Sequence, residues 1–320
     1  MPFEQEPKLN MTDELSGAER KIENNWEVID KGVWKPSIFA SFKESLAVGA
    51  STKQLKRNPE ARIRVTAPQD RFDKKFSEES HERRKDKIGA ARILINLLKK
   101  IAPGIDSHNI QKTALEHGNN IAVVDKEYLK KPKQERARVL ADGMITNLKE
   151  IPLMVTAADC APVGIYDPKH EAIGAFHSGW KGTLKQISPK GAKAMCENYG
   201  SDRKELLAAI GPRAGGEDFE VGQNVYDEFI GAKDEEGNPI YSPEEVNSFF
   251  KPNPDNPNHY FLDTGLAIKI SLLKAGILEE HIQVSQYSTM SKEGNGLFSS
   301  ERLEGPEARD SFAFMMALKK

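Results

Sequence analysis

Residues 156–182 read TAADCAPVGIYDPKHEAIGAFHSGWKG, and this stretch decides the fold prediction. Two short β-prone segments, 163–166 and 172–176, flank the sequence DPKH at 167–170. That sequence favours a tight turn, because Pro is preferred at the second turn position and Asp at the first. The stretch therefore predicts a β-hairpin. With the turn centred between residues 168 and 169, residues pair when their numbers sum to 337.

This pairing places Cys160 opposite His177. Directly opposed side chains have Cβ atoms about 4.5 to 5.5 Å apart. A thiolate and an imidazole at that separation can share one metal ion, with Zn–S about 2.3 Å and Zn–N about 2.0 Å. The glycines in HSGWKG, Gly179 and Gly182, favour an unusual turn where the chain lines a pocket. A wider turn would shift the register, and a packed cysteine beside a hydrogen-bonded histidine remains the alternative.

A third ligand must come from elsewhere in the chain. Catalytic zinc sites usually have three protein ligands and one open position. His117 is a candidate because it precedes Gly118 and a β-prone run at 121–124 that can join the same sheet. The other histidines lie in charged, turn or Pro/Asn-rich surroundings. Spacing alone leaves this assignment open.

Outside the hairpin, β-prone runs alternate with helical patterns, which predicts a mixed α/β fold. Helices are expected from Ser77 to about residue 101, from 188 to 200 and from 264 to 276, each ended by Gly or Pro-Gly. The further β-prone runs are 121–124, 153–156, 206–210 and 282–287.

The domain prediction is a peripheral extension at residues 1–45 followed by one domain at 46–320. Residues 232–259 are rich in Pro, Asn and acidic residues, so we expect an exposed insertion there.

Composition narrows the function classes. The 320 residues carry a net charge of −2 and are 38% hydrophobic, which is typical of a globular protein. A near-neutral chain is not expected to bind nucleic acid generally. No apolar run reaches the roughly 18 to 20 residues of a membrane span, and no secretory signal is evident. The two cysteines, Cys160 and Cys196, form no disulfide framework. We therefore expect a cytoplasmic protein without membrane partners.

An ordered series of motifs runs along the chain: HG at 117–118, ADG at 141–143, TAADCAPV at 156–163, FHSGWKG at 176–182, AAIGP at 208–212 and FEVG at 219–222. This series resembles the YfiH-like laccase-domain family, whose members are also described as multicopper polyphenol oxidases or purine nucleoside phosphorylases. The resemblance runs from Gly49, where the sequence GASTKQ begins, to the C-terminus.

The resemblance implies a single layered α/β (α+β) sandwich of mixed β-sheets flanked by helices. It also implies a zinc site formed by His117, Cys160 and His177, with copper as the alternative metal. The implied activity is phosphorolysis of purine nucleosides (adenosine, inosine and methylthioadenosine) together with adenosine deamination, so the expected partners are a nucleoside and phosphate. Zinc can lower the pKa of water toward about 7, which suits deamination.

Four further residues enter the candidate site. Asp159, beside the cysteine, is expected to act as a base or to orient a ligand. Lys181, Arg213 and Arg309 are candidate phosphate-binding cations, although Lys181 replaces the Arg common in the family and lacks its bidentate fork. The C-terminal motifs and the segment after Pro212 depart from the family pattern, which puts substrate preference in doubt. The sequence does not indicate an oligomeric state.

Two other function classes remain open. In the first, the protein is a metal-independent hydrolase of a small molecule or peptidoglycan precursor, with Cys160 as nucleophile and His177 as base. In the second, the protein is a non-catalytic family member that binds a partner. Multicopper oxidation is weaker, because it requires more ligands than these residues provide.

Overall fold

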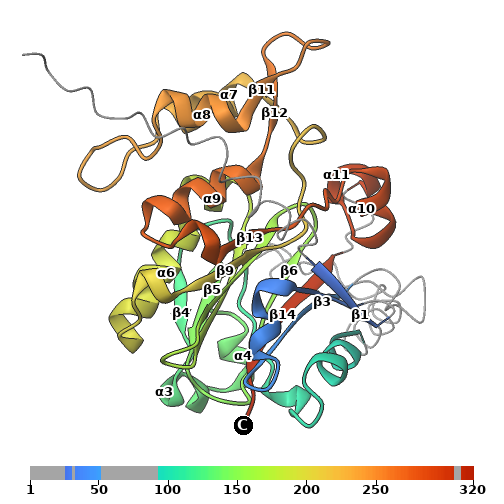
Figure 1. The fold of residues 1–320 in the computed structure, drawn as a ribbon, viewed down its shortest axis with the longest axis vertical. Coiled ribbons are helices and arrows are strands. Elements are labelled where there is room, and N and C mark those ends of the chain that lie inside the picture. The colour runs from blue at the N-terminus through green and yellow to red at the C-terminus, as the bar shows by residue number, and fades with distance from the viewer. Residues whose placement is uncertain (1–25, 31–32, 52–92, 306–310) are drawn as a thin grey trace, which may run out of the picture.

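The computed structural model describes residues 26–30, 33–51, 93–305 and 311–320. Its core is a pair of β-sheets with helices outside them (Figure 1). The first sheet has five antiparallel strands in the order β1 (Trp26–Asp30), β2 (Val33–Pro36), β3 (Leu46–Ser51), β14 (Phe312–Leu318) and β6 (Leu153–Ala157).

The second sheet has six strands and is mixed. In spatial order these are β13 (Ile282–Val284), β9 (Leu207–Ile210), β7 (Ala161–Asp167), β8 (Ala172–Ser178), β5 (Gly143–Thr146) and β4 (Ile121–Val123). The outer pairs β13/β9 and β4/β5 are parallel, and the inner pairs are antiparallel.

The helices cover the outer faces of these sheets and the upper part of the molecule. They are a helical segment at residues 93–101, α3 (Lys126–Lys130), α4 (Lys133–Arg136), α5 (Trp180–Leu184), α6 (Ile187–Tyr199), α7 (Gln223–Ile230), α8 (Pro243–Phe249), α9 (Thr264–Lys274), α10 (Lys292–Leu297) and α11 (Glu301–Glu304). No helix in these ranges combines the length and the apolar character needed to cross a lipid bilayer.

Strand β14 shows how the layers are built. All seven of its residues are buried. Successive side chains of a strand point to opposite faces of the sheet. Phe312, Phe314 and Met316 therefore pack between the two sheets, whereas Ala313 and Met315 pack against the helix at 93–101. The result is a helix–sheet–sheet–helix sandwich, which confirms the predicted fold class.

The other face of the six-stranded sheet packs on α6 and α9. Its centre is the ring of Phe176, which lies against three glycines. A Cβ atom on Gly143, Gly174 or Gly191 would lie only 2.5, 2.5 or 2.3 Å from an atom of that ring. Close packing tolerates no such overlap. Phe176 is thus held in a slot that these three missing side chains leave open.

The predicted helices at 188–200 and 264–276 are present as α6 and α9. Gly200 ends α6 in the left-handed conformation, with φ 74°, and Gly276 follows α9 with φ 95°. Both are C-terminal glycine stops of the expected kind. The expected start of the first helix, at Ser77, lies outside the described residues, and Pro103-Gly104 follows its end at residue 101.

The hairpin prediction is confirmed, but its register is wrong by two residues. The observed pairs run from Asp167↔Ala172 to Ala161↔Ser178, so the connection has four residues, 168–171. The Asp167 carboxylate accepts hydrogen bonds from the backbone N–H groups of Lys169 and His170, which stabilises this longer turn. Because the shift is an even number of residues, every side chain stays on its predicted face.

The segment 232–259 is only partly exposed, which corrects the expected insertion. Residues 233–239 are exposed almost throughout. Beyond them, Tyr241, Val246, Phe249 and Phe250 are buried in a cluster with α7 and the three-stranded sheet of β10 (Glu220–Gly222), β12 (His259–Leu262) and β11 (Phe250–Pro252).

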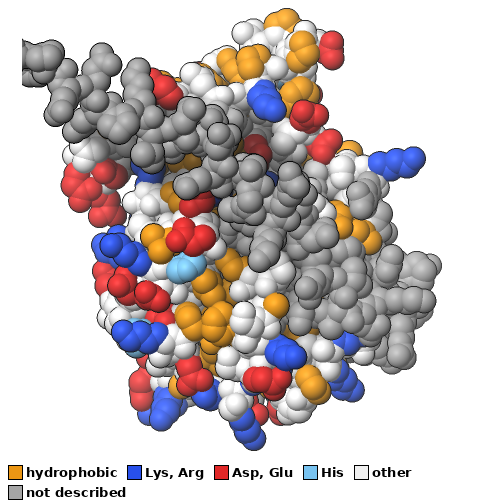
Figure 2. Space-filling view, in the orientation of Figure 1, with side chains coloured by type: hydrophobic (Ala, Val, Ile, Leu, Met, Phe, Trp, Pro, Cys, Tyr) orange, Lys and Arg blue, Asp and Glu red, His pale blue; other side chains and the backbone are white. Residues whose placement is uncertain are grey.

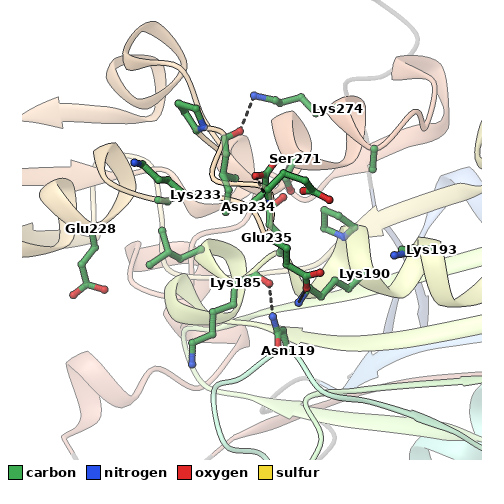
Figure 3. A pocket seen from close by; sticks show the side chains of 18 of the residues that line it. Asn119, Lys185, Lys190, Lys193, Glu228, Lys233, Asp234, Glu235, Ser271 and Lys274 are labelled. Atoms are coloured by element: carbon green, nitrogen blue, oxygen red, sulfur yellow. Dashed lines mark hydrogen bonds and ion pairs between the residues drawn. The ribbon is translucent and has the colours of Figure 1, made fainter.

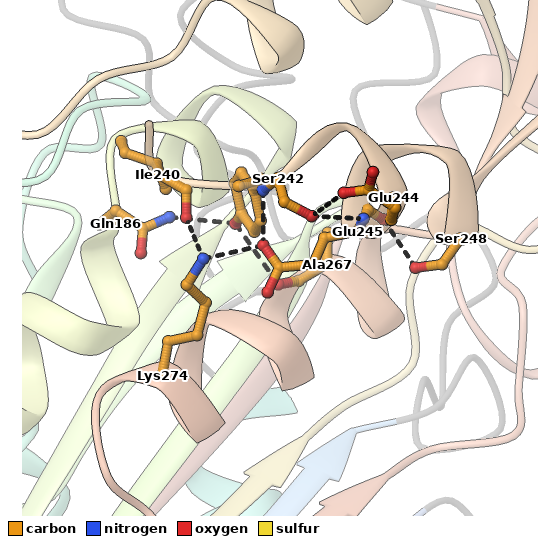
Figure 4. Close-up of polar contacts among 9 residues, drawn as sticks. Gln186, Ile240, Ser242, Glu244, Glu245, Ser248, Ala267 and Lys274 are labelled. Atoms are coloured by element: carbon orange, nitrogen blue, oxygen red, sulfur yellow. Dashed lines mark hydrogen bonds and ion pairs between the residues drawn. The ribbon is translucent and has the colours of Figure 1, made fainter. Parts of the chain in front are cut away.

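Polar contacts join the unit formed by α7, α8 and the three-stranded sheet to α9. Ser242 begins α8 with a capping box: its hydroxyl accepts from the Glu245 N–H at 3.2 Å, and the Glu245 carboxylate accepts from the Ser242 N–H at 2.7 Å. Lys274, at the end of α9, donates to the Glu245 carboxylate at 2.8 Å and to the Ile240 carbonyl at 2.7 Å (Figure 4). The unit is therefore anchored to the main sandwich.

The expected peripheral extension adds strands β1 and β2 to the edge of the five-stranded sheet. Val33 is fully buried and Phe39 is 3% exposed. The division of the chain at residue 45 stays a prediction.

On the face drawn in Figure 2, basic and acidic side chains are interspersed.

Candidate metal centre

Three side chains meet where the hairpin emerges from the six-stranded sheet. One ligand atom from each of His117, Cys160 and His177 lies within 4.8 Å of the others. The two imidazole rings have centroids 5.2 Å apart and are nearly perpendicular. A single divalent ion can bridge donor atoms at such separations. The geometry brings together the three residues that the sequence analysis proposed as ligands.

His177 is the most constrained of the three. It lies in β8 and is 3% exposed. Its Nδ1 is 2.9 Å from the carbonyl oxygen of Thr156 in β6. Because a carbonyl only accepts, Nδ1 carries the proton and donates it. The other nitrogen, Nε2, is buried and has no hydrogen-bond partner among the described residues. A buried lone pair without a donor fits a metal ligand.

Burial also sets the protonation of the two inner residues. Burial, together with the smaller effect of the His117 charge, lowers the pKa of His177 to about 4. Burial likewise raises the pKa of the half-buried Cys160 thiol to about 12, with an added contribution from the negative charge of Asp159. Without a cation, both groups are therefore neutral at physiological pH. A metal ion would displace the thiol proton.

His117 differs from its partners because it is exposed. It precedes β4 and has a φ of 56°, a conformation that few residues other than glycine adopt. The centre thus combines two inner donors with one at the surface, so its open side faces solvent.

Gly179 makes room for the sulfur. A Cβ atom at this position would lie 2.5 Å from the Cys160 Sγ and 3.8 Å from Cδ2 of His117. Its φ of −68° suits any residue, so space and not backbone conformation requires glycine here.

We expect Gly179→Ala to displace the Cys160 sulfur and weaken binding of zinc or Co²⁺ by about 10- to 100-fold, measured by chelator competition. Gly215→Ala is the matched control, since a Cβ there would contact Thr264 Oγ1 at an ordinary 3.5 Å. Equal affinities in the two variants would show that the space beside the sulfur is not needed.

Asp159 is adjacent to the candidate ligand Cys160, but both of its carboxylate oxygens are engaged. They accept from the Thr289 hydroxyl at 2.7 Å and from the Arg302 N–H at 2.8 Å. Its carbonyl accepts from the Ala214 N–H at 2.8 Å. These contacts tie the loop before Cys160 to three positions distant in sequence. The arrangement suits an orienting residue better than a base.

The three candidate phosphate-binding cations have different surroundings. Lys181 is exposed, with its Nζ 5.3 Å from the centre of the Trp180 ring. Arg213 is 8% exposed and donates to the carbonyl of Ser285 at 2.7 Å and to Asp263 at 3.1 Å. Its guanidinium therefore acts mainly within the protein. Arg309 lies outside the described residues.

A cavity of about 760 Å³ lies between α6, the exposed loop 233–239 and the end of α9 (Figure 3). Basic side chains of α6 and acidic side chains of the loop both line it. Two of its lining residues reach the metal centre's loop: Lys185 Nζ donates to the His117 carbonyl at 3.4 Å, and Asn119 Nδ2 donates to the Lys185 carbonyl at 2.7 Å. The cavity therefore adjoins the segment that carries His117.

Asp142 is the residue that sequence reasoning missed. It stands in the ADG motif, but no pattern around it signals that its carboxylate is fully buried and accepts from the backbone of residues 116–118.

Solved structures share this fold. The hypothetical protein YfiH of Bacillus licheniformis matches with a TM-score of 0.72 and 20% identity over 92% of this chain and all of that one. YlmD of Geobacillus stearothermophilus matches with a TM-score of 0.70 and 21% identity over 92% of this chain and 99% of that one.

Sequence relatives carry enzyme names. A purine nucleoside phosphorylase of Bacteroides thetaiotaomicron is 36% identical over 35% of this chain and 43% of its own length. The purine nucleoside phosphorylase YlmD of Bacillus subtilis is 31% identical over 60% of this chain and 66% of its own length. An adenosine deaminase of an unknown prokaryotic organism is 28% identical over 62% of this chain and 72% of its own length. These matches thus span between two fifths and three quarters of each relative.

The family model described as multi-copper polyphenol oxidoreductase laccase matches residues 85–316. This range holds all three ligand candidates, the whole six-stranded sheet, and β6 and most of β14 from the five-stranded sheet. The chain therefore belongs to the YfiH-like laccase-domain family.

Proposed function

We propose that the protein is a zinc-dependent purine nucleoside phosphorylase that also deaminates adenosine. The observation that carries the proposal is the buried Nε2 of His177, which lacks a partner among the described residues. One ligand atom of His177 also lies within 4.8 Å of ligand atoms of Cys160 and His117. Two imidazoles and one thiol suit zinc. The names of the relatives supply the substrate class.

Two reactions are proposed. In phosphorolysis, a phosphate oxygen bonds to C1′ of the nucleoside while the bond from C1′ to the purine nitrogen breaks. The purine leaves with that electron pair and takes up a proton, and the products are the free base and a pentose 1-phosphate. In deamination, water replaces the amino group of adenosine and gives inosine and ammonia. The expected substrates are adenosine, inosine and methylthioadenosine.

His117, Cys160 and His177 would hold the ion, and zinc would supply Lewis acidity to an oxygen atom of the reactants. The Thr156 carbonyl fixes the tautomer of His177, which leaves Nε2 as the nitrogen that can bind a metal. Lys181 is the exposed cation on the helix that follows Gly179, and we assign it to phosphate as a point charge. The cavity beside the His117 loop has the size of a small-molecule site, roughly 300 to 1,000 Å³.

The protonation of the inner pair favours this proposal over the cysteine hydrolase. A nucleophilic cysteine needs a lowered pKa or an adjacent base. Here burial raises the pKa of Cys160 to about 12 and lowers that of His177 to about 4. A thiolate–imidazolium pair is thus disfavoured.

The test is product analysis with purified protein, inosine and phosphate. We expect hypoxanthine and pentose 1-phosphate in equal amounts, no cleavage when phosphate is omitted, and ammonia from adenosine in either case. His177→Ala is expected to reduce the formation of hypoxanthine, pentose 1-phosphate and ammonia to the uncatalysed background. The absence of turnover with every nucleoside in zinc-loaded protein would support the non-catalytic alternative.

A further inference from the structure

A single buried carboxylate holds the loop of the exposed ligand. Asp142 immediately precedes β5 and is 0% exposed. Its oxygens accept hydrogen bonds from three consecutive backbone N–H groups, at 3.2 Å from Glu116, 3.0 Å from His117 and 2.8 Å from Gly118. Three successive amides that converge on one anion form a concave binding site. Here the anion is part of the protein.

These contacts explain the backbone of His117. Its φ of 56° is unfavourable for a residue with a side chain. Such a conformation persists only where the surroundings impose it. Hydrogen bonds to an ionised acceptor are about twice as strong as neutral ones, and the amides on both sides of the His117 Cα bond to the same carboxylate. The carboxylate therefore imposes the turn that directs the imidazole.

Asp142 also contacts the segment of a second ligand. Its carbonyl oxygen accepts from the His177 N–H at 2.7 Å. The same residue thus bonds to the strand of the buried histidine through its backbone and to the loop of the exposed histidine through its side chain. The position of Cys160 does not depend on Asp142. Cys160 immediately precedes β7, and the pairing of β7 with β8 places it.

We infer that Asp142 is the positioning residue of the metal centre, which sets the His117 imidazole against the inner Cys160–His177 pair. This inference rests on the proposed metal site and deepens it. The inner pair belongs to a hairpin that the sheet holds in place, whereas the third ligand depends on one carboxylate.

Asp142→Asn tests the role with little change of shape. An amide has one acceptor oxygen, and its NH₂ group can only donate. At least one of the three N–H groups then faces another donor, and the loop loses its imposed conformation. We expect the zinc dissociation constant to rise by about 10- to 100-fold.

A double-mutant cycle separates positioning from general damage. We would measure zinc affinity by chelator competition for Asp142→Asn, His117→Ala and the double variant. If Asp142 acts through His117, the double variant binds zinc as weakly as His117→Ala alone, because the ligand to be positioned is already missing. Independent effects that multiply in the double variant would overturn the inference.

Cobalt substitution gives a spectroscopic signature. Asp142→Asn should keep the thiolate charge-transfer band from Cys160, while its ligand-field bands should change in the same way as those of His117→Ala. A spectrum identical to that of the wild type would contradict the proposed role.

The matched control is Asp167→Asn. Asp167 is also 0% exposed and accepts from the backbone N–H groups of Lys169 and His170, at the far end of the hairpin. We expect the control to lose stability without a change in zinc affinity. Equal losses of affinity in both variants would assign the effect to general destabilisation.

Amide hydrogen exchange makes the outcome independent of metal. In Asp142→Asn, the amides of residues 116–118 should exchange faster than in the wild type, while those in β8 other than His177 stay protected. Unchanged exchange at 116–118 would refute the inference even if the protein bound zinc well. Failure of the wild type to bind zinc would refute the proposed metal centre, and the exchange result would still decide whether Asp142 holds the loop.

Discussion

Cys160→Ala is expected to reduce bound zinc from about one ion per chain to less than about a tenth of that. The sulfur is the only anionic donor of the three ligands when a metal is bound. Its replacement leaves two imidazoles, one of them exposed, and two neutral ligands compete poorly with water for the ion. Phosphorolysis and deamination should disappear together with the metal.

Metal content is measured by mass spectrometry of the purified wild type and variant, with copper determined in the same samples. Cys196→Ala is the matched control, because Cys196 is also a partly buried free cysteine but lies on α6 outside the centre. Zinc retained in Cys160→Ala would contradict the three-ligand site. If the wild type contains copper instead of zinc and Cys160→Ala loses it, the three ligands would stand and the assigned metal would be copper.

The second large effect is expected from chelation of the wild type. Removal of the metal should abolish phosphorolysis and deamination, and one equivalent of zinc should restore both, because the proposed Lewis acid is then present again. Activity is assayed before chelation, after it and after zinc is returned, and circular dichroism confirms that the protein stays folded.

The cysteine hydrolase alternative gives the opposite result, since its turnover would survive chelation and be blocked by iodoacetamide.

In the metal-free protein we expect slow alkylation of Cys160 at neutral pH. Burial raises the thiol pKa to about 12, so the reactive thiolate becomes abundant only as the pH approaches that value. Rapid alkylation at pH 7 would contradict the protonation that we describe.

Much of the fold and the site could be predicted from local patterns. The hairpin is visible in the sequence because β-prone segments flank a turn signal, and the fold class follows from alternating strand and helix patterns. His117 could be named from spacing only as one option, since it lies 43 residues before Cys160 and nothing local records that β4 reaches the same sheet. The family resemblance supplied that candidate ligand.

The errors have physical causes that the sequence does not display. The hairpin register depends on the hydrogen bonds of Asp167 to its own turn. Arg213 looked like an available cation because its partner, Asp263, is 50 residues away. In segment 232–259, the polar composition concealed Tyr241 and Phe249, which are each 1% exposed. Long-range contacts decide the last two cases, whereas the register depends on local hydrogen bonds within the turn.

The slot around Phe176 has a consequence for how far this family can vary. Gly143, Gly174 and Gly191 come from two strands and one helix. The Phe176 ring occupies the space that a side chain on any of them would need. A larger residue at any of the three positions is compatible only with a smaller one at 176, so the four positions are expected to change in concert in related chains. Because Phe176 directly precedes His177 in β8, the fixed ring also fixes the position of the buried histidine.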